Sequence, residues 1–226
     1  MICERLERVN ERIASAAQRA GRQVSEIHLL AVTKTHPRPV VEEAIACGMT
    51  ILGENRVQEA DAKYAGVAGV ELHLIGHLQR NKARSVPGLF SWVESIDSIA
   101  TAEALSRRCA DAEWPCSVLL QYNCSGEQTK SGYSDPELML EEAIRIAALP
   151  SLELRGIMTI GPFVDDTREI ARAFSVTRRL FERLQTQQPD GRIDTLSMGM
   201  TGDFETAIAE GSTEVRIGSA LFGARE

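Results

Sequence analysis

Lys34 is the residue whose setting in the sequence points most directly to chemistry. It comes just after the apolar run 29–32 and Thr33, so we expect it at the end of a buried strand. Loss of solvent favours the neutral form of an amine, and a neutral lysine attacks an aldehyde to form a Schiff base. A lysine at a strand end can equally extend its ammonium group into solvent. Position alone leaves both interpretations open.

Glycine residues form the second group with chemical meaning. They gather near the C-terminal end of the sequence, at Gly199, Gly202, Gly218 and Gly223. Backbone N–H groups in such loops bind phosphate, and Ser197 and Ser219 would add hydroxyl donors. Tight turns also use glycine. Combined with Lys34, the pattern indicates a phosphorylated carbonyl compound. Two ligand classes fit: a phosphosugar held by a Schiff-base aldolase, or pyridoxal 5′-phosphate (PLP).

The elements that must position these residues alternate along the sequence. Short apolar runs predict eight strands, at 28–32, 50–52, 71–75, 92–95, 117–122, 153–158, 194–198 and 214–217. Amphipathic stretches lie between them, which is typical of parallel strands joined by crossover helices. Eight such units in this length predict a single (β/α)8 TIM barrel. An open doubly wound sheet is the alternative.

Helical spacing of apolar residues supports this organisation. Residues 1–20 predict an extra N-terminal amphipathic helix, and we expect Asp203 to cap a helix that contains Ala207 and Ile208. Three crossover helices are indicated by apolar sets: Val40, Val41, Ala44 and Ile45; Leu140, Ala143, Ile144 and Ala147; and Ile170, Phe174, Thr177, Phe181 and Leu184. We find no linker-like stretch and therefore expect one domain over 1–226.

Composition restricts the classes of partner. The 226 residues carry a formal net charge of -7 with dispersed basic residues, which argues against a nucleic-acid binder. No apolar run is long enough to span a membrane, so we expect no membrane partner. The five cysteines are widely spaced and form no C-x-x-C pair. We therefore expect free thiols and a cytoplasmic protein. The absence of an obvious apolar surface stripe favours a monomer.

Seven sequence segments together resemble the pyridoxal phosphate homeostasis protein family, whose fold is like the N-terminal barrel domain of alanine racemase. They are AVTKTHP (31–37), GENRVQE (53–59), HLIGHLQRNK (73–82), NCSGEQTKSG (123–132), RGIMTIGP (155–162), LSMGM-x-x-D (196–203) and VRIGSALFG (215–223). The resemblance runs from about residue 5 to the C-terminus. It implies that the aldehyde is PLP and that the protein takes part in intracellular PLP homeostasis.

The resemblance also implies a role for particular residues. Lys34 would hold PLP as a Schiff base, and Asn55 would lie near the ring. Arg216 would face the pyridine nitrogen. The residues expected around the phosphate and the ring are Ser197, Met198, Gly199, Gly218 and Ser219. Where the family often has serine after the second methionine of its motif, this chain has Thr201, which retains the hydroxyl.

Arg216 bears on what PLP would do. Arginine is permanently cationic and only donates hydrogen bonds, so it favours an unprotonated pyridine and weak carbanion stabilisation. Alanine racemase also uses a second base from another domain and subunit, and we expect no such partner for Lys34 in a sequence that ends at Glu226. A PLP carrier that supplies PLP-dependent apo-enzymes is therefore the favoured function. The alternatives are a PLP-dependent amino-acid racemase or related enzyme with weak activity, and an aldolase without PLP.

Histidines complete the set of candidate residues. His28 and His73 lie within or at the start of predicted strands, and we interpret both as structural. The roles of His36 and His77, which follow strand ends, stay open. The histidines and carboxylates show no metal-ligand spacing, so we expect no metal site.

Overall fold

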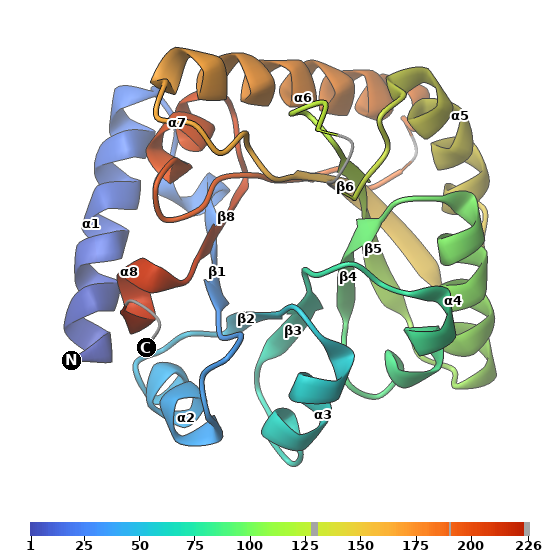
Figure 1. Ribbon diagram of the computed structural model, residues 1–226, viewed down its shortest axis with the longest axis horizontal. Helices are drawn as coiled ribbons and strands as arrows, with labels where there is room; N and C mark the ends of the chain where they lie inside the picture. The colour runs from blue at the N-terminus through green and yellow to red at the C-terminus, as the bar shows by residue number, and fades with distance from the viewer. Residues whose placement is uncertain (128–130, 190, 224–226) are drawn as a thin grey trace.

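Among the residues that the structure describes, eight parallel strands close into a barrel in the order of the sequence (Figure 1). The computed structural model describes residues 1–127, 131–189 and 191–223, so part of the 123–132 segment lies outside it. The strands are β1 (His28–Val32), β2 (Ile51–Glu54), β3 (Glu71–Leu74), β4 (Trp92–Ile96), β5 (Cys116–Tyr122), β6 (Leu152–Thr159), β7 (Thr195–Ser197) and β8 (Glu214–Ile217). The predicted fold class is confirmed.

Strand boundaries differ from prediction mainly at β2 and β7. The prediction ended β2 at Leu52, but Gly53 and Glu54 continue it because they pair with His73 and Leu74 of β3. Strand β7 is shorter than the predicted 194–198, because its pairing with β6 runs only from Thr195 to Ser197. Glu54 therefore lies within a strand rather than in the loop that follows it.

Helices surround the barrel. They are α1 (Ile2–Arg19), α2 (Arg38–Ala46), α3 (Val57–Tyr64), α4 (Ile99–Asp111), α5 (Pro136–Ala147), α6 (Thr167–Gln187), α7 (Phe204–Ala209) and α8 (Ser219–Phe222). Two short 3₁₀ helices, η1 (Val24–Glu26) and η2 (Arg80–Ser85), precede β1 and follow β3. The predicted N-terminal helix, α1, packs against α7 and α8, so the first helix of the chain lies beside the last two (Figure 1). In the part described, no helix is long and apolar enough to cross a membrane.

Side chains at helix starts explain several of these boundaries. Ser98, Asp135 and Asp166 each accept a backbone N–H from the first turn of α4, α5 and α6, respectively. The apolar faces agree largely with prediction, and all five residues expected on α6 are buried. Ile144 and Ala147 of α5 are exceptions, because both are exposed, Ile144 to 55%. Ile146 takes the core position that the predicted spacing gave to Ile144.

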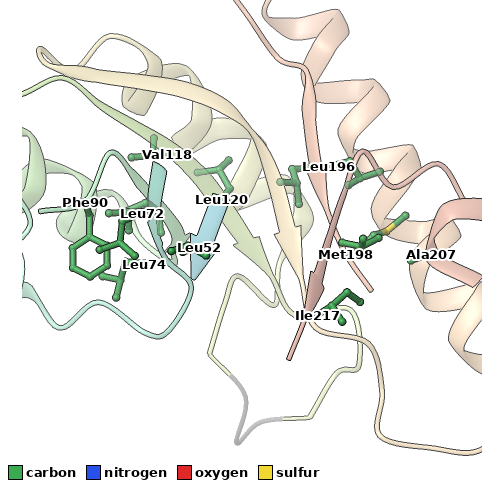
Figure 2. Packing of buried hydrophobic residues seen from close by; sticks show 14 of the residues in the cluster. Leu52, Leu72, Leu74, Phe90, Val118, Leu120, Leu196, Met198, Ala207 and Ile217 are labelled. Carbon is green, nitrogen blue, oxygen red and sulfur yellow. The ribbon is translucent and has the colours of Figure 1, made fainter. Parts of the chain in front are cut away.

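The main hydrophobic core lies between the strands and the helices. It takes alternate residues of each strand, as Leu52, Leu72, Leu74, Val118 and Leu120 illustrate (Figure 2). Burying each such side chain contributes about 1.5–3 kcal/mol. The intervening residues point into the barrel, where a second, smaller apolar cluster consists of Trp92, Leu119 and Met158. Much of the remaining interior is polar.

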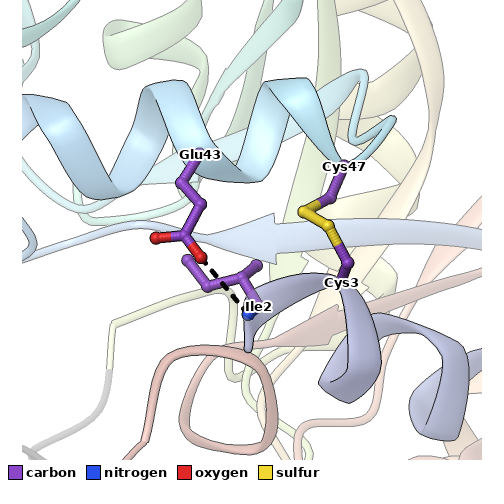
Figure 3. The surroundings of a disulfide bond; sticks show 4 residues. All are labelled: Ile2, Cys3, Glu43 and Cys47. Atoms are coloured by element: carbon purple, nitrogen blue, oxygen red, sulfur yellow. Dashed lines mark hydrogen bonds between the residues drawn. A yellow bond between two sulfur atoms is a disulfide. The ribbon is translucent and has the colours of Figure 1, made fainter.

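The expectation that all cysteines are free is wrong for one pair. Cys3 of α1 and Cys47, directly after α2, form a disulfide across 44 residues of sequence (Figure 3). The backbone N–H of Ile2 donates to Glu43 of α2 beside it, at 3.4 Å. The sequence offers no sign of this pairing, because barrel closure brings the start of α1 to the end of α2. Cys109, Cys116 and Cys124 are in no disulfide among the described residues.

Candidate functional site

A cavity of about 580 Å³ opens at the carboxyl ends of the strands. Its wall contains five of the eight predicted site residues: Lys34, Asn55, Arg216, Gly218 and Ser219. The remaining wall residues follow other strand ends and include His36, His77, Tyr122, Met200, Thr201 and Gly202. The volume suits a small phosphorylated ligand. The structure therefore brings five of the residues singled out from the sequence to one cavity at the carboxyl ends of the strands.

Lys34 occupies a tight turn directly after β1. The N–H of His36 donates to the carbonyl oxygen of Thr33 at 3.1 Å and closes the turn. Thr35 between them has a φ of 68°, a conformation that non-glycine residues adopt rarely. Such backbone is kept only where the surroundings hold it. The turn fixes the direction in which Lys34, which is half-buried, leaves the strand.

A buried group that we call the outer cluster, made of Thr33, Glu54, Lys63 and Tyr64, holds the start of this turn from outside the barrel. Lys63 of α3 donates from Nζ to Glu54 Oε1 at 2.8 Å and to the carbonyl oxygen of Thr33 at 2.9 Å. Thr33 Oγ1 donates to Glu54 Oε1 at 2.6 Å. It also lies 2.6 Å from the Tyr64 hydroxyl. The residue before Lys34 is thus bonded through both its side chain and its carbonyl group.

The outer cluster is not fully satisfied. Glu54 is completely buried, and its Oε2 has no hydrogen-bond partner among the described residues. Burial, together with the neighbouring charge of Glu54, raises the pKa of the Tyr64 hydroxyl, which therefore stays protonated and can donate. A buried carboxylate with one bare oxygen depends strongly on its single ion pair with Lys63.

Gly76, in the segment that follows β3, passes very close to the backbone of Asn55. A Cβ on Gly76 would overlap the carbonyl oxygen of Asn55, so only glycine allows this approach. Both residues line the cavity. The glycine in the segment 73–82 is therefore required by close backbone packing, which the periodicity of the sequence did not indicate.

Arg216 enters the cavity wall from inside the barrel. It is 4% exposed, and its guanidinium donates from Nη1 to Ser197 Oγ and from Nη2 to the carbonyl oxygen of Thr159, both at 2.7 Å. Its backbone N–H donates to the carbonyl oxygen of Gly199. Both hydrogen-bond acceptors are neutral, and the carboxylate oxygen Oε2 of Glu94 lies 4.0 Å from Nη1.

Three predicted site residues lie behind the wall rather than on it. Ser197 is fully buried beneath Arg216, and Met198 belongs to the main core. Gly199 has a φ of 96°, and a Cβ there would overlap Ala207. The loop that they begin supplies Met200, Thr201 and Gly202 to the wall instead.

The predicted glycine-rich corner lies where this loop meets Gly218 and Ser219. Thr201 Oγ1 accepts the N–H of Ala220 at 3.4 Å and ties the loop to α8. Asp203 occupies the position before α7 as expected, but it does not cap with its side chain. Its carboxylate accepts the N–H of Met200 instead. Asp203 therefore shapes the loop of the cavity rather than the helix.

The two histidines at strand ends have different surroundings. His77 Nδ1 lies 3.1 Å from Asp97 Oδ2, and His77 lines the cavity while 46% of its side chain is exposed. His36 packs its ring against Phe222 of α8, with centroids 4.9 Å apart. His77 thus has the carboxylate partner of an oriented acid or base, and His36 has a packing contact.

Sequence reasoning missed the residues that support Lys34 and Arg216. Glu54 ends β2, Glu94 lies within β4 and Glu214 begins β8, and all three are buried. A carboxylate in such a place must be paired, which is the signal that could have identified them. Their partners come from other elements and are not evident from the sequence.

Comparison with known proteins identifies the family of the chain. The family model described as "Alanine racemase, N-terminal domain" matches residues 5–226. The pyridoxal phosphate homeostasis protein of Escherichia coli is 45% identical over 100% of this chain and 97% of its own length. The protein of the same name from Pseudomonas aeruginosa is also 45% identical, over 100% of this chain and 96% of its own length.

Solved structures give the same picture. PipY of Synechococcus elongatus with PLP bound is 37% identical and superimposes with a TM-score of 0.84 over 99% of this chain and 100% of that one. A protein of unknown function from Bifidobacterium adolescentis is 42% identical, with a TM-score of 0.92 over 98% and 94%. Alanine racemase of Clostridium difficile shares the fold, with a TM-score of 0.72 at 13% identity over 96% of this chain and 56% of that one.

Proposed function

This chain belongs to the pyridoxal phosphate homeostasis protein family, and on that premise we propose that it binds PLP in the cavity at Lys34 and serves intracellular PLP homeostasis. The name of the family and the PLP bound to PipY support the choice of ligand. The wall of the cavity supports it independently, because its polar groups match the three functional parts of PLP.

The residues fit PLP part by part. Lys34 supplies the amine that would bond covalently to the aldehyde. Gly218, Ser219 and Thr201 line the corner where backbone N–H groups and hydroxyls would hold the phosphate. Arg216 would donate to the pyridine nitrogen and keep it unprotonated. Asn55 lies on the β2 side of the cavity, where the ring would fit.

Bound PLP supplies an electron-accepting ring, but the chain around it favours storage. The cationic Arg216 opposes protonation of the ring nitrogen, so the ring would accept electrons weakly. Ser197, Met198 and Gly199 would act behind the wall, where they support Arg216 and the loop at Met200. The observation that carries the proposal is the convergence of Lys34 and Arg216 on one cavity with the glycine corner.

Visible absorption of the purified protein with added PLP tests the proposal. We expect the wild type to show a new visible band, and Lys34→Ala to lack it. Lys82→Ala is the matched control, because Lys82 lines a neighbouring cavity rather than this one. A wild type without the band, or a Lys34→Ala variant that keeps it, would contradict the proposal.

Delivery to PLP-dependent apo-enzymes is the second part of the proposal. Three exposed apolar side chains in the wall of the cavity support it: Ile160, Phe163 and Met200. Phe163 is 97% exposed and lines the cavity. We expect Phe163→Ser to slow the reactivation of an apo-enzyme by the PLP-loaded protein without changing the visible band. Equal reactivation rates with the wild type and with Phe163→Ser would contradict a role for these exposed apolar side chains in delivery.

The His77–Asp97 pair favours a second candidate function, slow proton exchange on amino acids. Asp97 would orient the imidazole, and the other ring nitrogen would serve as a base. We expect the PLP-loaded protein to exchange the Cα proton of an amino acid for deuterium, and His77→Asn to abolish the exchange while keeping the visible band. Absence of exchange in the wild type across a panel of amino acids would eliminate this candidate.

We also propose that the protein acts in the cytoplasm as a single-domain monomer. Closure of the barrel supports the monomer, because it leaves no strand edge in the described sheet for pairing with another copy. Light scattering of the purified protein checks the mass, and a dimeric mass would contradict the proposal.

A further inference from the structure

A chain of polar side chains runs inside the barrel from the cavity to the opposite end. Arg216 of β8 lines the cavity, and His73 of β3 lines a second cavity of about 820 Å³ at the amino ends of the strands. Glu94 of β4 and Ser197 of β7 lie between them. All four residues are less than a tenth exposed. Together with the buried Glu214 of β8 they form what we call the inner column.

The contacts along the inner column are continuous. His73 Nδ1 lies 2.7 Å from Glu94 Oε1, and Ser197 Oγ lies 2.7 Å from Glu94 Oε2. Arg216 donates from Nη1 to the same Ser197 Oγ at 2.7 Å. The side chain of Ser197 therefore fixes one end of the guanidinium, and Glu94 fixes Ser197.

Proton counting gives the chain a direction. Ser197 Oγ is also 2.8 Å from Glu214 Oε1, but a hydroxyl donates only one hydrogen bond. Burial, together with the charge of Glu94, raises the pKa of Glu214 to about 8. Burial also raises the pKa of Glu94, but His73 and Arg216 outweigh this and lower it. Ser197 can therefore donate to only one of the two carboxylates, and Glu94, whose pKa is lowered by its neighbours, is the better acceptor.

His73 completes the column as a cation. Burial lowers its pKa, but the charge of Glu214 and the bonds to Glu71 and Glu94 outweigh burial and raise it to about 10. Its Nε2 lies 2.9 Å from Glu71 Oε1, so both ring nitrogens donate to carboxylates. Trp92 stacks on the ring at 4.9 Å between centroids. The imidazolium is thus held on two edges and one face.

A metal ion is the other interpretation of this group. His73, Glu94 and Glu214 offer ligand atoms within 4.8 Å of one another. However, the column already contains its own cations, since His73 bonds to carboxylates through both nitrogens and Arg216 Nη1 lies 4.0 Å from Glu94 Oε2. The buried charges are therefore compensated by the chain itself, which favours a positioning role.

We propose that Glu94 is a positioning residue for Arg216, acting through Ser197, and that His73 holds Glu94 from the amino end of the barrel. The inner column keeps the guanidinium directed at the cavity. The inference deepens the proposed PLP site, because Arg216 is the residue that would meet the pyridine nitrogen. It follows that a change at His73 alters the cavity at the other end of the barrel.

Ser197→Ala tests the central link, and Ser212→Ala is its matched control. Ser212 is an equally buried hydroxyl whose bonds go to the backbone carbonyl oxygens of Leu196, Met198 and Glu214. We expect Ser197→Ala to shift the visible band of the PLP-loaded protein and to weaken PLP binding about tenfold, the loss of one charge-assisted hydrogen bond. Ser212→Ala should change neither. A wild-type band and affinity in Ser197→Ala would overturn the inference.

A double variant separates positioning from general damage. In an Arg216→Lys background, Ser197→Ala should have no further effect on the band or the affinity, because the group that it positions is gone. Additive effects would contradict the link between the two residues.

A readout without PLP keeps this inference separate from the proposed function. The guanidinium ¹⁵N–H signals of Arg216 in the ligand-free protein can be identified by their loss in Arg216→Lys. We expect them to shift and to exchange faster with solvent in Ser197→Ala, Glu94→Gln and His73→Gln, and to stay unchanged in Ser212→Ala. Unchanged signals in the folded variants would overturn the inference. Failure to bind PLP would contradict only the proposed function.

Discussion

The two residues that define the site are supported in opposite ways. Lys34 is held from outside the barrel by the outer cluster, in which Lys63 and Glu54 form a direct ion pair at 2.8 Å. Arg216 is held from inside by the inner column. Its Nη1 donates to Ser197 Oγ and lies 4.0 Å from Glu94 Oε2. The outer cluster relies on a single buried ion pair. The inner column consists of several hydrogen bonds, some between neutral groups and some between charged ones.

The difference predicts different weaknesses. The outer cluster leaves Glu54 Oε2 without a hydrogen-bond partner among the described residues, so loss of Lys63 would strand a buried carboxylate. Most residues of the inner column bond to more than one neighbour, so one substitution there would reduce the free energy of unfolding less. We therefore expect the outer cluster to govern stability and the inner column to govern the properties of the ligand.

The largest effect is expected from Lys63→Met. Removal of the ammonium leaves Glu54 charged and buried, which costs about 3–5 kcal/mol of the free energy of unfolding. Urea unfolding measures this loss. Adding Glu54→Gln should recover part of it, because the stranded charge is removed. A loss of less than about 1 kcal/mol, as ordinary surface substitutions give, would contradict the expected difference between the outer cluster and the inner column.

Glu94→Gln tests the inner column by the same measurement. His73 keeps its bond to Glu71, and Ser197 keeps an acceptor in the new amide oxygen. We expect a smaller loss, about 1–3 kcal/mol. If Glu94→Gln destabilises the protein more than Lys63→Met does, the proposed contrast between the two supports is reversed.

The pH dependence of stability sharpens the description of the inner column. The raised pKa of Glu214 means that its contribution to stability is fully present below its ordinary value near 4.5 and is lost as pH rises to about 8. The groups facing it are His73 of β3, Glu94 of β4 and Ser197 of β7. We expect Glu214→Gln to lose less stability than the wild type across this window, as urea unfolding at several pH values would show. If the free energy of unfolding changes with pH in the same way in both proteins, the raised pKa of Glu214 is contradicted.

The smallest effect is expected from Tyr64→Phe in the outer cluster. The change removes one hydroxyl that lies 2.6 Å from Thr33 Oγ1 and leaves the ion pair intact. We expect a loss of about 1 kcal/mol in urea unfolding. A loss as large as that of Lys63→Met would mean that the hydroxyl, rather than the ion pair, holds the cluster together.

Much of the fold could be predicted because strand ends and helix faces leave local patterns. The bounds of β1 and β8 agree with prediction, and so does the buried face of α6. The same strand-end pattern predicted Lys34 near one end of the barrel, where it lines the cavity, whereas Arg216 was expected there from the family resemblance.

The remaining features depend on contacts between distant parts of the chain. Lys63 belongs to an amphipathic helix and looks like an ordinary surface lysine until α3 packs behind β1. Ser197 was expected at the phosphate, but β7 turns it toward Glu94 and Arg216. The Cys3–Cys47 disulfide depends on closure of the barrel in the same way. Sequence periodicity carries no information on such pairings.

Borohydride reduction of the PLP-loaded protein, followed by peptide mass mapping, tests the central claim most directly. Reduction makes the bond between an amine and an aldehyde permanent, so it marks the lysine that holds PLP. The proposed site predicts one modified peptide, the one that contains Lys34, and no modification in Lys34→Ala. A label on Lys63, Lys82 or another lysine with Lys34 unmodified, or no label at all, would contradict it.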